Sequence, residues 1–241
     1  MSEATLSARA TRLPSFAAEP VLLEGATIYS VMFEVDPAAV DDLLPPALHP
    51  SLPPTATIMA YQCPKSPWGA FQLVQLRLGC RAAHRLRSFV VSAVVDNADA
   101  AEALERGWGY PCRPGTVNLR RRFDEIALIV TESEQVTLDV RLLDPVPVGP
   151  GDVIFDPNLH TVDSPRGLRL LQVEPVIVPE KAERGEPRMR AFDAAAWGER
   201  GVLPIFRVSG SLVAADITLP KLVYALYWDT SPIRGVDKID E

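Results

Sequence analysis

Apolar and polar residues alternate along short stretches of this chain, and the alternation predicts β-strands. In residues 71–80, FQLVQLRLGC, every second residue from Val74 onward is apolar, with Gln75 and Arg77 between them. A period of two is expected of a strand with one buried face, so we expect Gln75 and Arg77 on the opposite face. Further stretches rich in Val, Ile, Leu, Thr and Tyr lie at residues 26–35, 55–61, 86–95, 125–133, 135–143, 168–178 and 209–219. Their strand-turn rhythm predicts an antiparallel sheet.

Helices are predicted at only three places, residues 36–45, 97–107 and 220–229. In the first, Asp36 is placed to cap the helix, and Pro37 occupies the first turn, where its missing N–H costs nothing. In the second, Asn97 or Asp99 would cap the start and Gly107 would end the helix. The third begins at a proline and spaces its apolar residues along one face.

The chain of 241 residues, 47% of them hydrophobic, is long enough to bury a sizeable core. No repeat or change of composition marks a second domain. We therefore expect a flexible N-terminal segment over residues 1–18 and one α+β domain, predominantly antiparallel β, over residues 19–241.

Charge and composition exclude several classes of partner. A net charge of -7 and a pI near 5.1 give no electrostatic reason to bind nucleic acid or an anionic membrane. The chain has no run of about 18 apolar residues of the kind that spans a bilayer, so we expect a cytoplasmic protein. The three cysteines form no CxxC pair, and there is no glycine-rich phosphate loop, so neither a metal nor another cofactor is expected.

One stretch carries a specific resemblance. Residues 94–115, VVDNADAAEALERGWGYPCRPG, run from a strand through "DN" and a short helix to Tyr-Pro and two further side chains. This order resembles the acetoacetate decarboxylase family, and "TIMAY" at 57–61 and "LVAADITLP" at 212–220 are similar to other parts of it. The resemblance covers residues 19–229. It implies a closed, cone-shaped antiparallel sheet around an apolar pocket, and a homo-oligomer.

The catalytic positions depart from the family pattern. Where the family has two lysines, the first of which forms a Schiff base with a ketone, this chain has Cys112 and Arg113. Cysteine forms no iminium, and arginine keeps its proton. The resemblance also places Gln72 at or next to the family's catalytic glutamate, and Ala26 close to its arginine. Schiff-base decarboxylation is therefore not expected, unless one of the four lysines has taken over as the amine: Lys65, Lys181, Lys221 or Lys238.

The three residues predicted to carry chemistry are Arg113, Gln72 and Cys112. Arg113 would hold a carboxylate or polarise a carbonyl and so stabilise an enolate; alternatively it pairs with a carboxylate such as Glu105. Gln72 would bind a substrate oxygen. Cys112, beside a cation, would be a nucleophile, against the alternative of a small buried apolar residue.

Four aromatic residues near these motifs are predicted to contact substrate. Tyr61 and Tyr110 would present hydroxyl groups, and Trp68 and Trp108 would form pocket walls; the alternative for each is ordinary packing.

The sequence thus favours a cofactor-independent enzyme of small-molecule metabolism, of a specialised, polyketide-type kind. It would catalyse cyclisation, dehydration or isomerisation of a carbonyl-containing substrate without a Schiff base. Two alternatives stay open: decarboxylation of a β-keto acid without an imine, and a non-catalytic protein that binds a small molecule.

Overall fold

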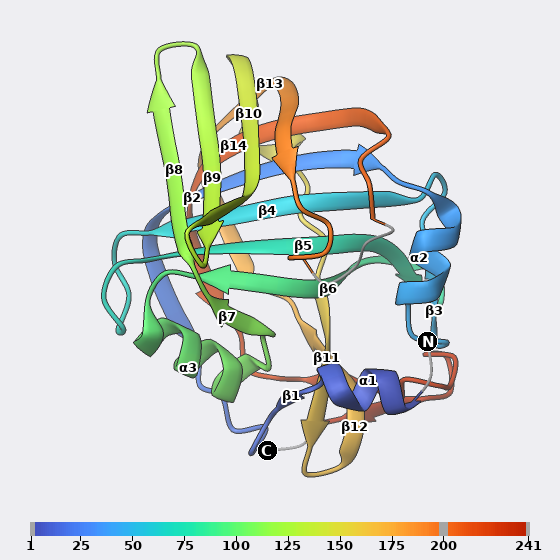
Figure 1. Ribbon diagram of the computed structural model, residues 1–241. Helices are drawn as coiled ribbons and strands as arrows, with labels where there is room; N and C mark the ends of the chain where they lie inside the picture. The colour runs from blue at the N-terminus through green and yellow to red at the C-terminus, as the bar shows by residue number, and fades with distance from the viewer. Residues whose placement is uncertain (1–2, 198–201, 240–241) are drawn as a thin grey trace.

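The computed structural model describes residues 3–197 and 202–239, which form one sixteen-stranded sheet accompanied by three short α-helices (Figure 1). Hydrogen-bonded neighbours follow the order β16-β15-β12-β11-β6-β5-β4-β2-β14-β13-β10-β9-β8, with β1, β3 and β7 attached to β11, β5 and β6. The strands are β1 Thr11–Arg12, β2 Val21–Glu34, β3 Leu48–Pro50, β4 Thr55–Cys63, β5 Phe71–Ala82, β6 Arg85–Val95, β7 Cys112–Pro114, β8 Thr116–Arg122, β9 Glu125–Glu132, β10 Gln135–Val148, β11 Asn158–Ser164, β12 Gly167–Val173, β13 Val176–Phe192, β14 Phe206–Leu219, β15 Tyr224–Leu226 and β16 Val236–Lys238.

The predicted α+β class with a largely antiparallel sheet is confirmed. All eight predicted strand stretches lie in the sheet, and residues 168–178 are divided between β12 and β13. Parallel pairing occurs where β6 meets β7 and β11, and where β1 meets β11. No helix in the described part of the chain is long and apolar enough to cross a bilayer.

Local chemistry sets the ends of α2 (Pro37–Leu43) and α3 (Ala98–Trp108). The Asp36 carboxylate accepts a hydrogen bond from the Ala38 N–H, and the Asn97 side chain accepts one from the Ala100 N–H, so both N-terminal predictions hold. The predicted end at Gly107 is wrong. The helix continues to Trp108 and is closed by Gly109, whose φ of 67° is the left-handed conformation that glycine adopts without strain.

The helix predicted for residues 220–229 is also wrong. Residues 224–226 form strand β15, which pairs with β12 on one side and β16 on the other. Ala225 and Leu226 are buried by this pairing. The spacing of apolar residues in this segment suits a helix as well as a strand. Pairing with β12 and β16 therefore decides its conformation.

The N-terminal residues lie against the rest of the chain. Helix α1 (Glu3–Arg9) and β1 precede the domain boundary that we expected at residue 18, and Leu6 and Leu13 are each 1% exposed. The Leu13 N–H donates to the Asp163 carbonyl. Flexibility of residues 1–18 stays a prediction.

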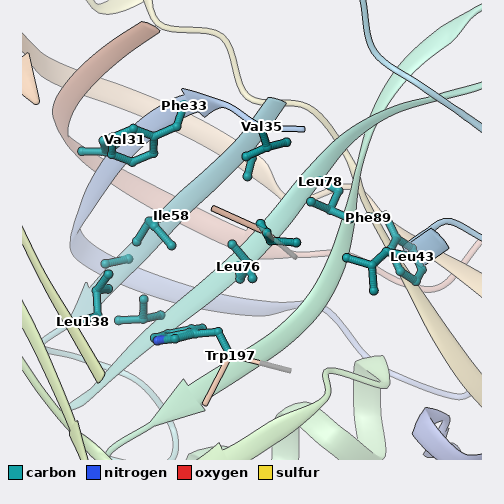
Figure 2. Close-up of a cluster of buried hydrophobic side chains, with 14 of the residues drawn as sticks. Val31, Phe33, Val35, Leu43, Ile58, Leu76, Leu78, Phe89, Leu138 and Trp197 are labelled. Atoms are coloured by element: carbon teal, nitrogen blue, oxygen red, sulfur yellow. The ribbon is translucent and has the colours of Figure 1, made fainter. Parts of the chain in front are cut away.

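Strand β5 is buried on both faces, which contradicts the single buried face expected from its alternation. Val74, Leu76 and Leu78 lie in one hydrophobic cluster, which also contains Trp197, whereas Phe71 and Leu73 lie in a second (Figure 2 shows part of the first). The strand is central, between β4 and β6, and each of its faces is covered. Gln75 and Arg77, on the side of Leu73, are therefore buried rather than solvated.

The sheet is not closed by backbone pairing, because β8 and β16, at the ends of the strand order, form no ladder with each other in the described residues. A side chain makes a connection instead. The Gln72 amide donates to the Val117 carbonyl at 2.9 Å and accepts from the Leu119 N–H at 3.2 Å, which joins β5 to β8. Gln72 thus occupies a position that a neighbouring strand's backbone would fill, and its amide is engaged at both ends.

We expect Gln72→Leu to lower the free energy of unfolding by about 2 kcal/mol. The change leaves one carbonyl and one N–H of β8 without partners in a partly buried place, and an unmet buried group costs about 1–3 kcal/mol. Urea titration would measure the loss. The matched control is Gln62→Leu, because Gln62 in β4 is the residue that pairs with Gln72 across the two strands. An unchanged unfolding midpoint in Gln72→Leu would contradict the bridging role.

Candidate active site

The first part of the candidate site is a buried cation with neutral partners. Arg77 in β5 is 2% exposed. Its Nε donates to Gln75 Oε1 at 2.7 Å, its Nη2 donates to the Tyr61 hydroxyl, and its guanidinium carbon lies 5.6 Å from the Tyr61 ring centroid. Within the described residues Arg77 makes no ion pair. A guanidinium taken out of water without a carboxylate beside it is costly, which makes this arrangement unusual in a protein core.

The second part lies on β11 and the loop after α3. The Asn158 side-chain amide donates to the Tyr110 hydroxyl at 3.2 Å, and the Tyr110 and His160 rings meet edge to face with centroids 4.2 Å apart. His160 is completely buried, and neither of its ring nitrogens has a hydrogen-bond partner in the structure. Burial, and then the positive charge of Arg77, lower the pKa of His160 to about 3, so the imidazole is neutral at physiological pH.

Strand register brings the two parts together. Strand β6 separates β5 from β11, with Val90 opposite Arg77, and Asn158 opposite Ser88. Extending that register by two residues puts His160 beside Val90. Arg77 is also close enough to lower the pKa of Tyr110, although burial outweighs this and raises it overall. Tyr61, Gln75 and Arg77 therefore form one polar cluster with Tyr110, Asn158 and His160.

A hollow lies on the same face of the sheet. Its lining is apolar apart from Tyr61 and Tyr110, whose hydroxyl groups lead back to the polar cluster; the other lining residues include Leu23, Leu73, Leu104 and Ile217. In this structure the free space holds little more than one water molecule. The predicted contact residues Tyr61 and Tyr110 thus share one hollow.

The two predicted tryptophans lie nearby on the same side, in contact with the second cluster. Trp108 is buried, and Trp68 packs against it with ring centroids 6.1 Å apart. The Trp108 indole N–H donates to the Pro220 carbonyl at 2.8 Å. Neither tryptophan lines the hollow itself, so the structure places them as supporting residues at its margin.

Cys112, to which the family resemblance assigns the position of the lysine, also packs against the second cluster. Burial, and then the charge of Glu105, raise the pKa of its thiol above the usual range. Cys63, which lines the hollow, has its thiol pKa raised to about 12 by burial and Asp96. Both thiols are therefore protonated at neutral pH and poor nucleophiles in this state. The nucleophilic role predicted for Cys112 stays a prediction.

Arg113 and Gln72 lie on the opposite face. Arg113 forms a two-point ion pair with Glu132, with distances of 2.5 and 3.1 Å, and its guanidinium carbon is 5.1 Å from the ring centroid of Trp197 in the first cluster. Thr137 donates to the same carboxylate. The alternative role considered for Arg113, pairing with a carboxylate, has Glu132 as its partner rather than Glu105. The predicted site is thus divided between the two faces of the sheet.

Sequence reasoning missed Arg77, Gln75, Asn158 and His160. Arg77 and Gln75 stood at the polar positions of an alternating strand, which indicates solvent exposure when only one face is thought to be buried. His160 was isolated in the sequence, and only the parallel pairing of β11 with β6 brings it near β5. No local pattern signals that pairing.

We expect the stability of the protein to fall by about 2 kcal/mol between pH 7 and pH 5 through His160 alone. The folded pKa of about 3 lies below the unfolded value near 6.5, so the unfolded chain binds the extra proton in that interval and stability is lost as the pH falls. Urea midpoints measured at both pH values, for wild type and His160→Gln, would give the difference. His84→Gln, at an exposed histidine, serves as control. An equal pH dependence in His160→Gln and wild type would contradict the assignment.

The fold and the site define the class, a largely antiparallel sheet protein with a buried polar cluster beside a small apolar hollow. Comparison with known proteins gives the family. The family model described as acetoacetate decarboxylase (ADC) matches residues 7–147, so the chain belongs to the acetoacetate decarboxylase family. A comparison with curated protein sequences found no match.

Solved structures support the same fold. Acetoacetate decarboxylase from Legionella pneumophila subsp. pneumophila str. Philadelphia 1 is similar with a TM-score of 0.76 and 18% identity, over 86% of this chain and 88% of that one. The enduracididine biosynthesis enzyme MppR complexed with pyruvate is similar with a TM-score of 0.69 and 19% identity, over 84% of this chain and 89% of that one. An acetoacetate decarboxylase-like enzyme from Sphingomonas wittichii RW1 is similar with a TM-score of 0.66 and 16% identity, over 85% of this chain and 92% of that one. At these identities the likeness concerns the fold, and chemistry has to be argued from the site.

Proposed function

We propose that this protein is a cofactor-independent enzyme that cyclises, dehydrates or isomerises a small carbonyl-containing carboxylate without forming a Schiff base. The observation that carries the proposal is Arg77, a buried guanidinium with two neutral partners, directly behind the Tyr61 wall of the hollow. A substrate carboxylate or a developing enolate supplies the negative charge that this cation lacks.

The buried guanidinium of Arg77 would stabilise negative charge that develops on a substrate oxygen during a reaction. In a buried site a fixed cation interacts with an oxyanion more strongly than in water, and it needs no reorganisation as the charge develops. The Tyr61 and Tyr110 side chains both line the hollow, and in this proposal their hydroxyl groups orient a carbonyl oxygen. Arg77 also acts on the Asp156 carboxyl, whose pKa is raised overall because burial outweighs the lowering effect of Arg77 and Arg87.

The lysines support chemistry without an imine. Lys65 and Lys221 lie at the surface, where they pair with Glu24 and Glu19, and Lys181 and Lys238 are exposed. None of the four lines the hollow. A Schiff-base amine has to reach the substrate carbonyl inside a pocket, and these four side chains lie outside the hollow.

The experiment incubates the protein with acetoacetate and other short keto acids, follows products by proton NMR, and measures intact mass after borohydride reduction. We expect conversion of a keto acid and an unchanged protein mass. A reduced adduct would contradict the proposal and restore the family's amine mechanism. Carbon dioxide release without an adduct would favour the decarboxylase alternative, and saturable binding without any product would favour a binding protein.

Arg113, Gln72 and Cys112 carry an alternative proposal, in which the family's loop rather than Arg77 holds the reacting oxygen atoms. Its support is the family resemblance, in which Cys112 and Arg113 follow the Tyr-Pro motif and Gln72 falls at or next to the catalytic glutamate. The two proposals differ in which arginine meets the substrate, and the Arg77 and Arg113 variants described in the Discussion separate them.

We also propose a cytoplasmic homo-oligomer. Apolar side chains that a monomer leaves exposed support self-association, among them Phe123 at the β8–β9 turn, which is 97% exposed, and the run Leu203, Ile205, Phe206 and Val208 at the start of β14. Light scattering coupled to size-exclusion chromatography tests the proposal, and a monomeric mass would contradict it.

A further inference from the structure

The polar cluster contains more hydrogen-bonding capacity than the protein itself satisfies. Gln75, Asn158 and His160 are each at most 1% exposed. Four of their atoms have no partner in the structure: Gln75 Nε2, Asn158 Oδ1, and both ring nitrogens of His160. Buried polar atoms in proteins are nearly always matched, by other protein groups or by a bound molecule. Several unmet atoms in one cluster therefore indicate a place for a polar group from outside the chain.

The kinds of atom define that group. Gln75 Nε2 is a donor and Asn158 Oδ1 an acceptor, and a neutral imidazole offers one donor and one acceptor. A carboxylate only accepts hydrogen bonds, so it would leave Asn158 and one nitrogen of His160 unmatched. A hydroxyl group donates one hydrogen bond and accepts two, so it can match three of the four atoms, one more than a carboxylate can.

Arg77 separates the roles of two substrate groups. The Arg77 guanidinium donates a hydrogen bond to Gln75, and its charge lowers the pKa of His160. The cation and the atoms without partners therefore lie in the same cluster. Its forked donors suit a carboxylate, whereas the mixed donors and acceptors around it suit a neutral group. One small molecule that carries both groups would satisfy both parts of the cluster.

We propose that Gln75, Asn158 and His160 form a subsite for a hydroxyl or enol group of the substrate, so that the enzyme selects short hydroxy acids or their enol equivalents over acids without that group. The inference rests on the proposed function, in which Arg77 takes the carboxylate. His160 acts here as a neutral hydrogen-bonding residue that determines specificity. No proton needs to be transferred to it.

The test uses matched four-carbon acids, chosen short because the hollow is small. 3-Hydroxybutyrate carries a hydroxyl group where butyrate has only hydrogens and acetoacetate has a carbonyl oxygen. Binding of each acid to the full-length protein is measured by isothermal titration calorimetry and ligand-observed NMR. We expect 3-hydroxybutyrate to bind wild type roughly tenfold to a hundredfold more tightly than butyrate, since a buried site built for a hydroxyl group discriminates against its absence.

Variants then assign the preference to residues. His160→Leu should remove the advantage of 3-hydroxybutyrate and leave butyrate binding unchanged, and His160→Gln, which keeps a donor and an acceptor, should restore part of it. Asn158→Leu provides a second route if His160→Leu fails to fold. Arg77→Met should weaken both acids alike.

The outcomes separate the two proposals. Equal binding of butyrate and 3-hydroxybutyrate to wild type, with both dependent on Arg77, would overturn the hydroxyl subsite and assign the unmet atoms to bound water, while the proposed function stands. Failure of all three acids to bind would contradict both. The wild-type comparison decides the subsite even if every variant misfolds.

Discussion

Arg77→Met is expected to reduce turnover of a keto acid at least a hundredfold and, at the same time, to raise the free energy of unfolding by about 1 kcal/mol. The loss of turnover follows from removing the cation that would meet an oxyanion, a kind of interaction worth about 3 kcal/mol in other enzymes. The gain in stability has a separate cause. A guanidinium buried without an ionic partner carries a desolvation cost that methionine removes, and the two hydrogen bonds lost at Gln75 and Tyr61 offset much of that gain.

Steady-state kinetics and urea unfolding measure the two effects on the same preparation. Arg87→Met is the matched control, because Arg87 is also buried in the sheet and also donates to a glutamine, Gln172, but lies away from the hollow. It should keep full activity. An Arg77→Met protein that turns over substrate at the wild-type rate would remove Arg77 from the mechanism, whatever its stability.

Arg113→Met is expected to have the opposite pair of effects. Removing the guanidinium leaves the Glu132 carboxylate, only 16% exposed, without its main partner, and should lower the free energy of unfolding by about 2 kcal/mol. This figure lies below the 3–5 kcal/mol typical of a fully buried pair, because water reaches the arginine side chain and screens the interaction. Activity per folded molecule should be unchanged.

A double-mutant cycle with Glu132→Leu isolates the ion pair. The double variant should recover part of the stability lost in Arg113→Met, because no carboxylate is then left unpaired. Loss of turnover in a stable Arg113→Met protein would contradict this account and support the role that the family resemblance predicts for Arg113.

The sequence predicted the sheet well, because each strand stretch carries its own composition and turn signals. Capping was equally local: Asp36 and Asn97 bond N–H groups only two or three residues away. The helix predicted for residues 220–229 failed for a long-range reason. Its conformation depends on pairing with β12, more than fifty residues earlier, and no spacing within the segment records that partner.

The candidate site was predictable only in part. The Tyr-Pro motif led to Tyr110, and the stretch TIMAY at 57–61 led to Tyr61, and these two do share a hollow. Which side of a strand a residue occupies is easy to predict, but whether that side is buried depends on the covering elements. Arg77 was therefore given no role, and Arg113, beside the motif, was given the role that its cation suggests. Both faces of β5 are covered because the strand is central in the sheet, and the position of Arg113 depends on the pairing of β7 with β6.

The narrow space between Tyr61 and Tyr110 has a consequence for kinetics. If the resting hollow admits little more than a water molecule, a four-carbon acid enters only during excursions in which these rings rotate or the neighbouring strands separate. The apparent affinity is then reduced by the fraction of molecules that are open, and the observed binding rate levels off at the opening rate as ligand concentration rises. Substituting either tyrosine by a smaller residue should accelerate ligand entry while loosening selectivity, so the closed hollow would trade speed of capture for exclusion of water.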